Sequence, residues 1–416
     1  MYCKQRRCVQ HFRPITLPFP GGGAKDNMQD TLEESRAQVR ERILAWLADQ
    51  QQAMQDLLQK VVDIDSGSRD EAGVTAVASV LRERLVAAGV AVELVPVPGY
   101  GVLLQAQVPG PTEGAPILLM GHMDTVYPAG TVARRPFRVA DGRAYGPGVA
   151  DMKSGLVMNA FVAEAFARCG GLTAPLRLFF SCDEEIGSPA TREQIMAAAR
   201  GARAVLNAEP GRVSGNLVTS RKGSMAVEFE VDGVAAHAGI NPAAGASAIG
   251  ALAHKILALH ALTDPDVGTT TNVGVVQGGI VPNMVAPLAK AELDVRYTAE
   301  TDPDELFERV RAIVESESLP RTMGRITGMR RTLPMKPTPG ELLALYQRGA
   351  ESLGFSVQGE FTGGAADSGL TASVGAPTLC GTGPVGGHPH TEREYCELST
   401  LVPRAQAVAL AILDHP

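Results

Sequence analysis

Four short apolar runs of this chain share one feature, which is that a histidine or an acidic residue follows each of them along the chain. The runs occupy residues 117–120, 176–181, 204–207 and 377–380. Their length and the turn residues that bound them predict β-strands. Stretches with helical apolar spacing lie between them, so the pattern predicts an α/β sheet with helices on its faces. Catalytic groups in such sheets gather at the carboxyl ends of strands.

The remaining elements divide the chain into outer segments and a middle block. In the outer segments we predict one helix or a helix pair over 32–62, helices over 71–88, 154–168, 191–200, 341–353 and 398–413, and strands over 90–97 and 102–108. The middle block has strands over 225–231, 272–277, 289–297 and 324–330 and helices over 245–262 and 304–316. This βαββαβ order is typical of a ferredoxin-like α+β unit. We therefore expect three parts, namely a leader over 1–30, a domain built from 31–217 and 331–416, and an inserted domain over 218–330.

Composition narrows the class of protein. The 416 residues carry a formal net charge of −7, which argues against nucleic acid or an anionic membrane as a partner. No apolar run approaches the ~20 residues that span a bilayer, and the basic start has no apolar segment behind it, so no secretory signal is predicted. Six scattered cysteines favour a reducing compartment. We expect a cytoplasmic protein, with Met28 as an alternative start.

The first two candidate site residues, His122 and Asp124, follow a predicted strand and lie two residues apart, on the same side of the backbone. The imidazole is placed to bind a metal ion, and Asp124 can accept the other ring N–H and fix the ring's orientation. Asp151 follows a glycine-rich turn, and a carboxylate held by a turn can bridge two cations about 3.5–4 Å apart. A histidine in a surface turn and a helix-capping aspartate are the ordinary alternatives.

An acidic triplet, Asp183, Glu184 and Glu185, follows the second of the four strands. Three adjacent acids at a buried strand end are costly unless cations or protons compensate their charge. One carboxylate can bind a metal ion while its neighbour takes a proton from a metal-activated water. Glu209 follows the third strand and supplies another carboxylate in an equivalent position.

Two histidines, His388 and His390, lie in the loop after the last of the four strands. Either could reach a metal ion, and one more nitrogen ligand would complete a symmetric pair of sites. A solvent-exposed loop histidine is the alternative for both.

Taken together, these residues resemble a known family, the co-catalytic dizinc aminoacylases and carboxypeptidases, and especially its bacterial glutamate carboxypeptidase branch. The likeness covers about Leu57 to the C-terminus. Its motifs are Gly-His-Met-Asp-Thr-Val (121–126), Gly-Pro-Gly-Val-Ala-Asp-Met-Lys-Ser-Gly (146–155), Asp-Glu-Glu-Ile-Gly-Ser (183–188) and His-Thr (390–391), in family order and at family-like spacing. The resemblance implies a three-layer, mixed-sheet catalytic domain of the zinc-peptidase type with an inserted ferredoxin-like dimerisation domain.

The same resemblance implies two sets of metal ligands that share one bridging carboxylate. They are His122, Asp151 and Glu209 for one ion and Asp151, Glu185 and His390 for the other. Glu184 would act as the general base, and the peptide bond after Asp151 would be cis. His390 matches the ligand position better than His388 does, because Thr391 follows it directly.

Residues of the inserted segment also resemble functional residues of the family. His237 resembles the histidine that reaches across a dimer to polarise the scissile carbonyl of the partner's substrate. Asn283 and Arg296 resemble residues that bind the terminal carboxylate of the substrate, for which a guanidinium offers a planar two-point fork. Gly364 lies in the stretch 362–367, which resembles the family's glycine-rich substrate loop. A turn histidine and a surface salt bridge are the alternatives for His237 and Arg296.

The function that follows is metal-dependent hydrolysis of the amide bond before a C-terminal amino acid, in a small peptide or an N-acyl amino acid. We expect two divalent ions, zinc above all, although the ligand set would also accept cobalt or manganese. An N-carbamoyl amino acid amidohydrolase is the alternative enzyme, and a non-catalytic metal- or amino-acid-binding protein is the alternative outside enzymes. Because Glu184 and all five ligand candidates are present, an enzyme is favoured.

Two further expectations concern the inserted segment. We expect it to form a homodimer, and Arg221 and Lys222 at its start could attract an acidic group, with an exposed basic turn as the alternative. Because His237 and Arg296 lie in the insertion and the metal ligands do not, we expect hinges near 214–220 and 330–334 that close the two domains.

Overall fold

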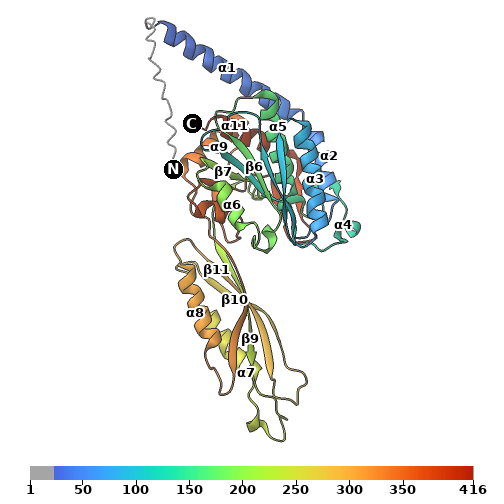
Figure 1. The fold of residues 1–416 in the computed structure, drawn as a ribbon, viewed down its shortest axis with the longest axis vertical. Coiled ribbons are helices and arrows are strands. Elements are labelled where there is room, and N and C mark those ends of the chain that lie inside the picture. The colour runs from blue at the N-terminus through green and yellow to red at the C-terminus, as the bar shows by residue number, and fades with distance from the viewer. Residues whose placement is uncertain (1–22, 416) are drawn as a thin grey trace, which may run out of the picture.

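The protein is described by a computed structural model that covers residues 23–415, with side chains described from Ser35 onward. Two bodies are evident, and each has its own sheet (Figure 1). The larger contains an eight-stranded sheet with helices packed around it, and the smaller contains a four-stranded sheet with two helices. The predicted α/β fold with an inserted α+β unit is therefore confirmed.

The large sheet is mixed, with the strand order β1-β2-β6-β3-β7-β14-β8-β13. Its strands are β1 (Ala91–Val97), β2 (Gly101–Gln107), β3 (Ile117–His122), β6 (Leu176–Ser181), β7 (Ala204–Asn207), β8 (Leu217–Arg221), β13 (Gly359–Thr362) and β14 (Thr378–Cys380). β6, β3, β7 and β14 run parallel to one another, so their carboxyl ends lie at the same edge. These are the four apolar runs of the sequence, and every residue of β3 and β7 is buried, which is typical of parallel strands covered on both faces.

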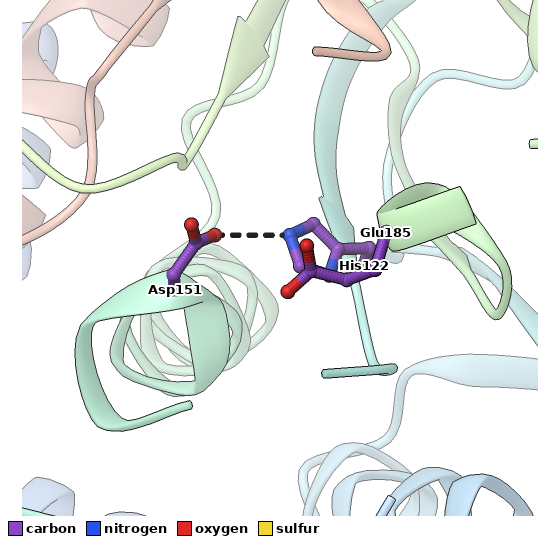
Figure 2. A group of neighbouring side chains, drawn as sticks. All are labelled: His122, Asp151 and Glu185. Carbon is purple, nitrogen blue, oxygen red and sulfur yellow. Dashed lines mark hydrogen bonds and ion pairs between the residues drawn. The ribbon is translucent and has the colours of Figure 1, made fainter. Parts of the chain in front are cut away.

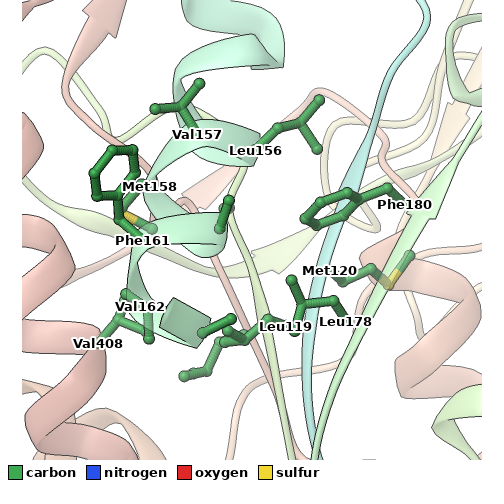
Figure 3. Close-up of a cluster of buried hydrophobic side chains, with 14 of the residues drawn as sticks. Leu119, Met120, Leu156, Val157, Met158, Phe161, Val162, Leu178, Phe180 and Val408 are labelled. Atoms are coloured by element: carbon green, nitrogen blue, oxygen red, sulfur yellow. The ribbon is translucent and has the colours of Figure 1, made fainter. Parts of the chain in front are cut away.

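The centre of the helical layer is α5 (Ser154–Cys169), whose residues are buried on all sides from Ser154 to Phe166. A helix that is apolar all round belongs inside a core. Its side chain Leu156 lies beside Phe180 of β6, whereas Phe161 points to the opposite side of the helix, where its ring centroid lies 6.1 Å from that of Trp46 in α1 (Gly23–Ala48) (Figure 3). The surrounding helices are α1, α2 (Gln51–Val62), α3 (Glu71–Ala87), α6 (Arg192–Ala199), α9 (Gly340–Ser352) and α11 (Leu401–Leu413).

The small sheet is antiparallel throughout, with the order β10-β11-β9-β12. Its strands are β9 (Gly223–Asp232), β10 (Thr270–Gly278), β11 (Leu288–Tyr297) and β12 (Met323–Thr332), and its helices are α7 (Ala248–His260) and α8 (Pro303–Glu315). Every second residue of β9 and β11 is buried beneath these helices, and together they form a separate apolar core. The predicted βαββαβ order is confirmed.

Several short elements were not predicted from the sequence. They are β8, β13, α4 (Thr131–Arg134), α10 (Ser368–Ser373) and a third sheet of β4 (Arg138–Ala140), β5 (Arg143–Tyr145), β15 (Gly386–Gly387) and β16 (Tyr395–Glu397). These runs have two to six residues and no sustained apolar pattern, so apolar periodicity does not reveal them. The third sheet matters for the site, because β5 leads into the turn with Asp151 and the β15–β16 connection carries His390.

The chain passes from the large sheet to the small one at Lys222 and returns after Thr332. Most of the first expected hinge, 214–220, therefore lies within β8, where pairing with β14 and β13 holds it. Residues 23–30 of the predicted leader belong to α1, and its residues 1–22 lie outside the described residues. Among the helices that are described, none is both long and apolar enough to cross a bilayer.

Candidate metal centre and active site

The carboxyl edge of the large sheet brings the first predicted ligand set together. His122 ends β3 and is buried, and its Nε2 atom lies 3.2 Å from Asp151 Oδ1 and 3.9 Å from Glu209 Oε1. Figure 2 shows the Asp151 carboxylate directed at the imidazole, with Glu185 beside them. One ligand atom from each of His122, Asp151 and Glu185 lies within 4.8 Å of the others. The peptide bond between Asp151 and Met152 is cis, as the resemblance implied.

The second predicted ligand set converges on the other side of Asp151. His390 Nε2 lies 3.4 Å from Asp151 Oδ2 and 3.2 Å from Glu185 Oε2. The two carboxylate oxygens of Asp151 thus face two different histidines, which is the arrangement a bridging ligand needs. His388 instead packs its ring against that of Tyr395, with the centroids 5.9 Å apart. The structure therefore brings His390, and not His388, to the acidic residues.

The donor set and its spacing fit divalent cations. Zinc–ligand bonds of about 2.0–2.2 Å in a tetrahedral site leave roughly 3.3 Å between ligand atoms, and the contacts of His122 and His390 with Asp151 are 3.2 and 3.4 Å. Glu185 Oε1 is buried and has no hydrogen-bond partner among the described residues. A buried carboxylate oxygen without a partner is costly, so a cation is its natural counterpart.

Asp124 has a different contact pattern from the one expected. His122 Nδ1 lies 3.0 Å from the backbone carbonyl oxygen of Asp124 and 3.4 Å from its carboxylate. The carboxylate accepts hydrogen bonds from Ser68 Oγ at 2.6 Å and from the backbone N–H groups of Glu184 and Glu185, both at 3.1 Å. It therefore fixes the short helical turn that carries these two residues, as well as lying beside the imidazole.

Burial raises the pKa values of the carboxyl groups at this edge. The pKa of Glu184 lies well above its ordinary value, that of Glu185 is about 7 and that of Glu209 is about 8. Burial by itself also raises the pKa of Asp151, but hydrogen bonds with His122 and His390 bring it below its ordinary value.

The pKa values of both imidazoles are raised by the neighbouring carboxylates. Hydrogen bonds to Asp151 and Glu185 raise the pKa of His390 to about 10. Burial by itself lowers the pKa of His122, but Asp124 and Asp151 together raise it well above its ordinary value. Without cations the centre is thus held together by protons, and metal binding has to release them.

Three acids have roles that sequence reasoning did not assign. Asp183 accepts hydrogen bonds from Ala190 N at 2.7 Å and Thr191 N at 3.2 Å, so it holds a loop and does not join the ligands. Asp367 accepts one from Ser181 Oγ at 3.0 Å, within the stretch predicted to line the substrate. Glu394, which is wholly buried, accepts hydrogen bonds from the turn that contains Asp151. An acid four residues after His390 carries no signal of this contact in the sequence.

A cavity of about 390 Å³ lies against the centre and extends to the small sheet. It is lined by Glu184 and the carboxylate ligands on one side and by Arg296 of β11 on the other, with Gly364 also at its wall. Arg296 forms an ion pair of 3.0 Å with Asp294. Arg221 lines the same cavity and donates hydrogen bonds to Gly364 O and Cys380 Sγ, at 3.0 and 3.3 Å.

The other two predicted residues of the insertion, His237 and Asn283, lie away from this cavity. Both are exposed, and they are neighbours, because Ala238 N donates to Asn283 O at 2.9 Å. β11 separates them from Arg296, since Asn283 precedes the start of β11 and Arg296 lies near its end (Figure 1). Within one chain, therefore, Asn283 and Arg296 are not brought together.

Residues 118–414 match the sequence model of the family described as Peptidase family M20/M25/M40. The chain belongs to this family. It is 29% identical over 391 residues to carboxypeptidase G2 of Pseudomonas sp. (strain RS-16), a match that covers 91% of this chain and 93% of that protein. The predicted family is confirmed, and with it the prediction of a hydrolase of the metallopeptidase class.

Solved structures agree on the fold. The M20 family metallo-carboxypeptidase Sso-CP2 from Sulfolobus solfataricus superposes with a TM-score of 0.73 at 18% identity, over 87% of this chain and 99% of that one. A Bacillus subtilis protein described as a dinuclear metal binding peptidase of the same family gives 0.63 at 16% identity, over 87% and 97%. At these identities the likeness concerns the fold alone.

Proposed function

We propose that this M20-family chain is an exopeptidase or deacylase that hydrolyses the amide bond before a free C-terminal amino acid. The observation that carries the proposal is the single cavity with Glu184 and the carboxylates Asp151, Glu185 and Glu209 on one wall and the guanidinium of Arg296 on another. Such a cavity holds the groups needed to activate water next to a group that binds a terminal carboxylate.

The ligand assignment follows the contacts. His122, Asp151 and Glu209 would hold one cation and Asp151, Glu185 and His390 the other, zinc being the expected metal and cobalt or manganese also compatible with the donor set. When bound, two such ions polarise a substrate carbonyl and make a water molecule acidic near neutral pH.

Glu184 is the residue proposed to move the proton. Its backbone is fixed by Asp124, yet its side chain reaches the cavity, so it is positioned without being one of the assigned ligands. Burial raises the pKa of its carboxyl group, which brings it closer to the range in which a base both accepts and returns a proton at neutral pH. Glu184 would take a proton from water and deliver it to the departing nitrogen of the amide.

Two arginines are proposed to recognise the substrate. Arg296 would bind the terminal carboxylate by its planar fork, for which it would give up its half-buried ion pair with Asp294. Arg221 contacts a carbonyl oxygen and a thiol rather than a carboxylate, so its charge favours a second acidic group on the substrate. Its neighbour Lys222 lies at the crossing between the sheets, outside the residues that line the cavity.

A second copy of the chain is proposed to complete the site. His237 and Asn283 are exposed, and they lie beyond the paired ends of β9 and β11 that are opposite to Arg296, so they cannot reach the cavity of their own chain without a large rearrangement. The adjacent surface exposes apolar side chains, with Leu257 of α7 72% exposed and Val276 of the edge strand β10 50% exposed. An unpaired edge strand with apolar neighbours favours pairing with another chain. A homodimer through the insertion, with His237 acting on the partner's substrate, is therefore part of the proposal.

The compartment and the domain limits belong to the same proposal. The cysteines described as free include the buried Cys182, Cys380 and Cys396, which favours a reducing compartment and thus the cytoplasm. The inserted domain would span 218–330 between catalytic segments 31–217 and 331–416.

The experiment that tests this function supplies zinc-reconstituted protein with dipeptides, N-acyl amino acids and N-carbamoyl amino acids, each also with its C-terminal carboxylate amidated. We expect cleavage of free acids, fastest for those with a second carboxylate, and a loss of about 10–100-fold in kcat/KM on amidation or in an Arg296→Ala variant, because one charged hydrogen-bonded contact is removed. Equal rates on free and amidated substrates would contradict the role of Arg296. Preference for the N-carbamoyl compounds would favour the alternative amidohydrolase.

A further inference from the structure

Glu394 occupies an unusual place beside the candidate metal centre. Its carboxylate is wholly buried and accepts hydrogen bonds from three backbone N–H groups of one turn. These are the N–H groups of Gly148 at 3.1 Å, Ala150 at 2.9 Å and Asp151 at 3.0 Å. The phenol of Tyr127 donates a fourth, at 2.8 Å. A single side chain thus satisfies three backbone N–H groups in the turn that presents Asp151.

The strand pairing explains how an acid so distant in sequence reaches this turn. Tyr395 of β16 pairs with Tyr145 of β5, so the two strands lie side by side. Asp151 follows β5 by six residues, and Glu394 directly precedes β16, at the end of the loop that carries His390. The two loops that present Asp151 and His390 therefore leave neighbouring strands, and Glu394 lies between them.

A second contact fastens the same loop. Tyr127 Oη also lies 2.9 Å from Thr391 O, so its single proton is shared between that carbonyl oxygen and the Glu394 carboxylate. Thr391 directly follows His390, so Tyr127 and Glu394 together hold the segment that follows the histidine. Glu394 itself is not among the residues that line the cavity, and its oxygens are occupied by backbone donors. Its position suits support of the ligands rather than metal binding.

We propose that Glu394 is a positioning residue that fixes the bridging carboxylate of Asp151 relative to His390 and thereby sets the affinity of the centre for its cations. The inference rests on the proposed two-metal centre. Partners that orient metal ligands in this way typically contribute 10–100-fold to metal affinity or activity. A carboxylate is suited to the task because it only accepts hydrogen bonds, whereas an amide in its place would turn an N–H group toward a backbone N–H donor.

The test compares Glu394→Gln with wild type, with Tyr127→Phe and with Glu392→Gln, a matched change at an exposed acid of the same loop. Metal-free proteins are titrated with zinc by calorimetry, their melting temperatures are measured with and without zinc, and kcat and KM are determined. For E394Q we expect about 10–100-fold weaker zinc binding, a smaller zinc-induced rise in melting temperature and a lower kcat with KM changed less than about twofold. Y127F should show the same changes at smaller size, and E392Q should match wild type.

Other outcomes overturn the inference. Zinc affinity and kcat equal to wild type in E394Q would do so, as would a melting temperature lowered equally with and without zinc at unchanged affinity, because that describes a purely structural role. Equal losses in E392Q would assign the effect to loop charge. Should E394Q not fold, wild-type zinc affinity in Y127F would count against the inference. If the wild-type protein itself binds no pair of zinc ions, the proposed function fails instead, and the two failures are distinct.

Discussion

The two groups of candidate catalytic residues in this chain are built in opposite ways. At the carboxyl edge of the large sheet, His122, Asp151 and Glu185 are held by strand ends and by backbone hydrogen bonds donated to side chains of distant segments. At the tip of the small sheet, His237 and Asn283 are exposed and contact only their immediate surroundings. The first group is preorganised in a single chain, and the second is not brought to it.

This difference teaches that half of the proposed site is complete within one chain and half is not. Preorganised groups act without reorganisation and account for the largest catalytic effects. Exposed groups on the smaller body would contribute to catalysis only when a second protein surface contacts them. Each of the following predictions changes one side of this comparison.

The largest expected effect is at the sheet edge. Replacing Glu184 by Gln should lower kcat by about 10²–10⁴-fold, because the proposed base is removed, while zinc binding stays near wild type because Glu184 is not among the assigned ligands. Steady-state kinetics and zinc stoichiometry check this, with the exposed Glu193→Gln as control. A near-normal kcat in E184Q would show that the base is misassigned.

The next effect concerns the tip. His237→Ala should lower kcat by about 10²–10³-fold, as loss of one donor to the reacting carbonyl does. If His237 acts across a dimer, mixing inactive H237A with inactive E184Q should restore activity, because a mixed dimer contains one site with both residues. Random pairing gives about a quarter of wild-type activity. Mixtures that remain inactive, although subunit exchange is verified by mass spectrometry, would place His237 in its own chain's site or outside catalysis.

The smallest expected effect is on thermal stability, and it concerns only the residues at the carboxyl edge of the large sheet. Burial raises the pKa of Glu185 to about 7 and of Glu209 to about 8, whereas both lie near 4.5 when unfolded. A carboxyl group with a raised folded pKa contributes stability that is present below its unfolded pKa and is lost as pH rises through the folded pKa. His390, raised to about 10, has the same sign, its contribution being lost above about pH 6.5.

The melting temperature of the metal-free protein should therefore fall between pH 5 and 8, and bound zinc should reduce this fall because cations favour the ionised carboxylates. Differential scanning calorimetry in the presence of a chelator, repeated with zinc, measures both slopes. Glu209→Gln should flatten the metal-free slope, and Glu193→Gln should leave it unchanged. Equal slopes with and without zinc would argue against cation binding at these acids.

Much of this architecture follows from local pattern. The four parallel strands, α5 and the βαββαβ block were predicted within a few residues, because apolar runs bounded by turn residues and apolar residues at helical spacing report burial directly. The ligand candidates were found for a related reason, because histidines and acidic residues that follow predicted strands can be recognised in a single sequence. The third sheet was missed because strands such as β15, with two residues, have no periodicity to read.

Contacts between distant segments decided the rest. The family resemblance already favoured His390 over His388, but only the structure shows that the His388 ring packs on Tyr395 while His390 faces Asp151. The support of Asp151 by Glu394 spans 243 residues of sequence, and the separation of Asn283 from Arg296 depends on the direction of β11.

The sequence by itself determined which elements form and which acids and histidines are available, because each of these depends on residues close together along the chain. The order of its motifs, through the family resemblance, also indicated a metal-dependent hydrolase. Only the tertiary structure decided which oxygen faces which imidazole, which acid supports rather than binds, and which residues one chain leaves exposed. The physical reason is that hydrogen bonds and ion pairs act over about 3–4 Å, and that distance is set by packing, not by position in the sequence.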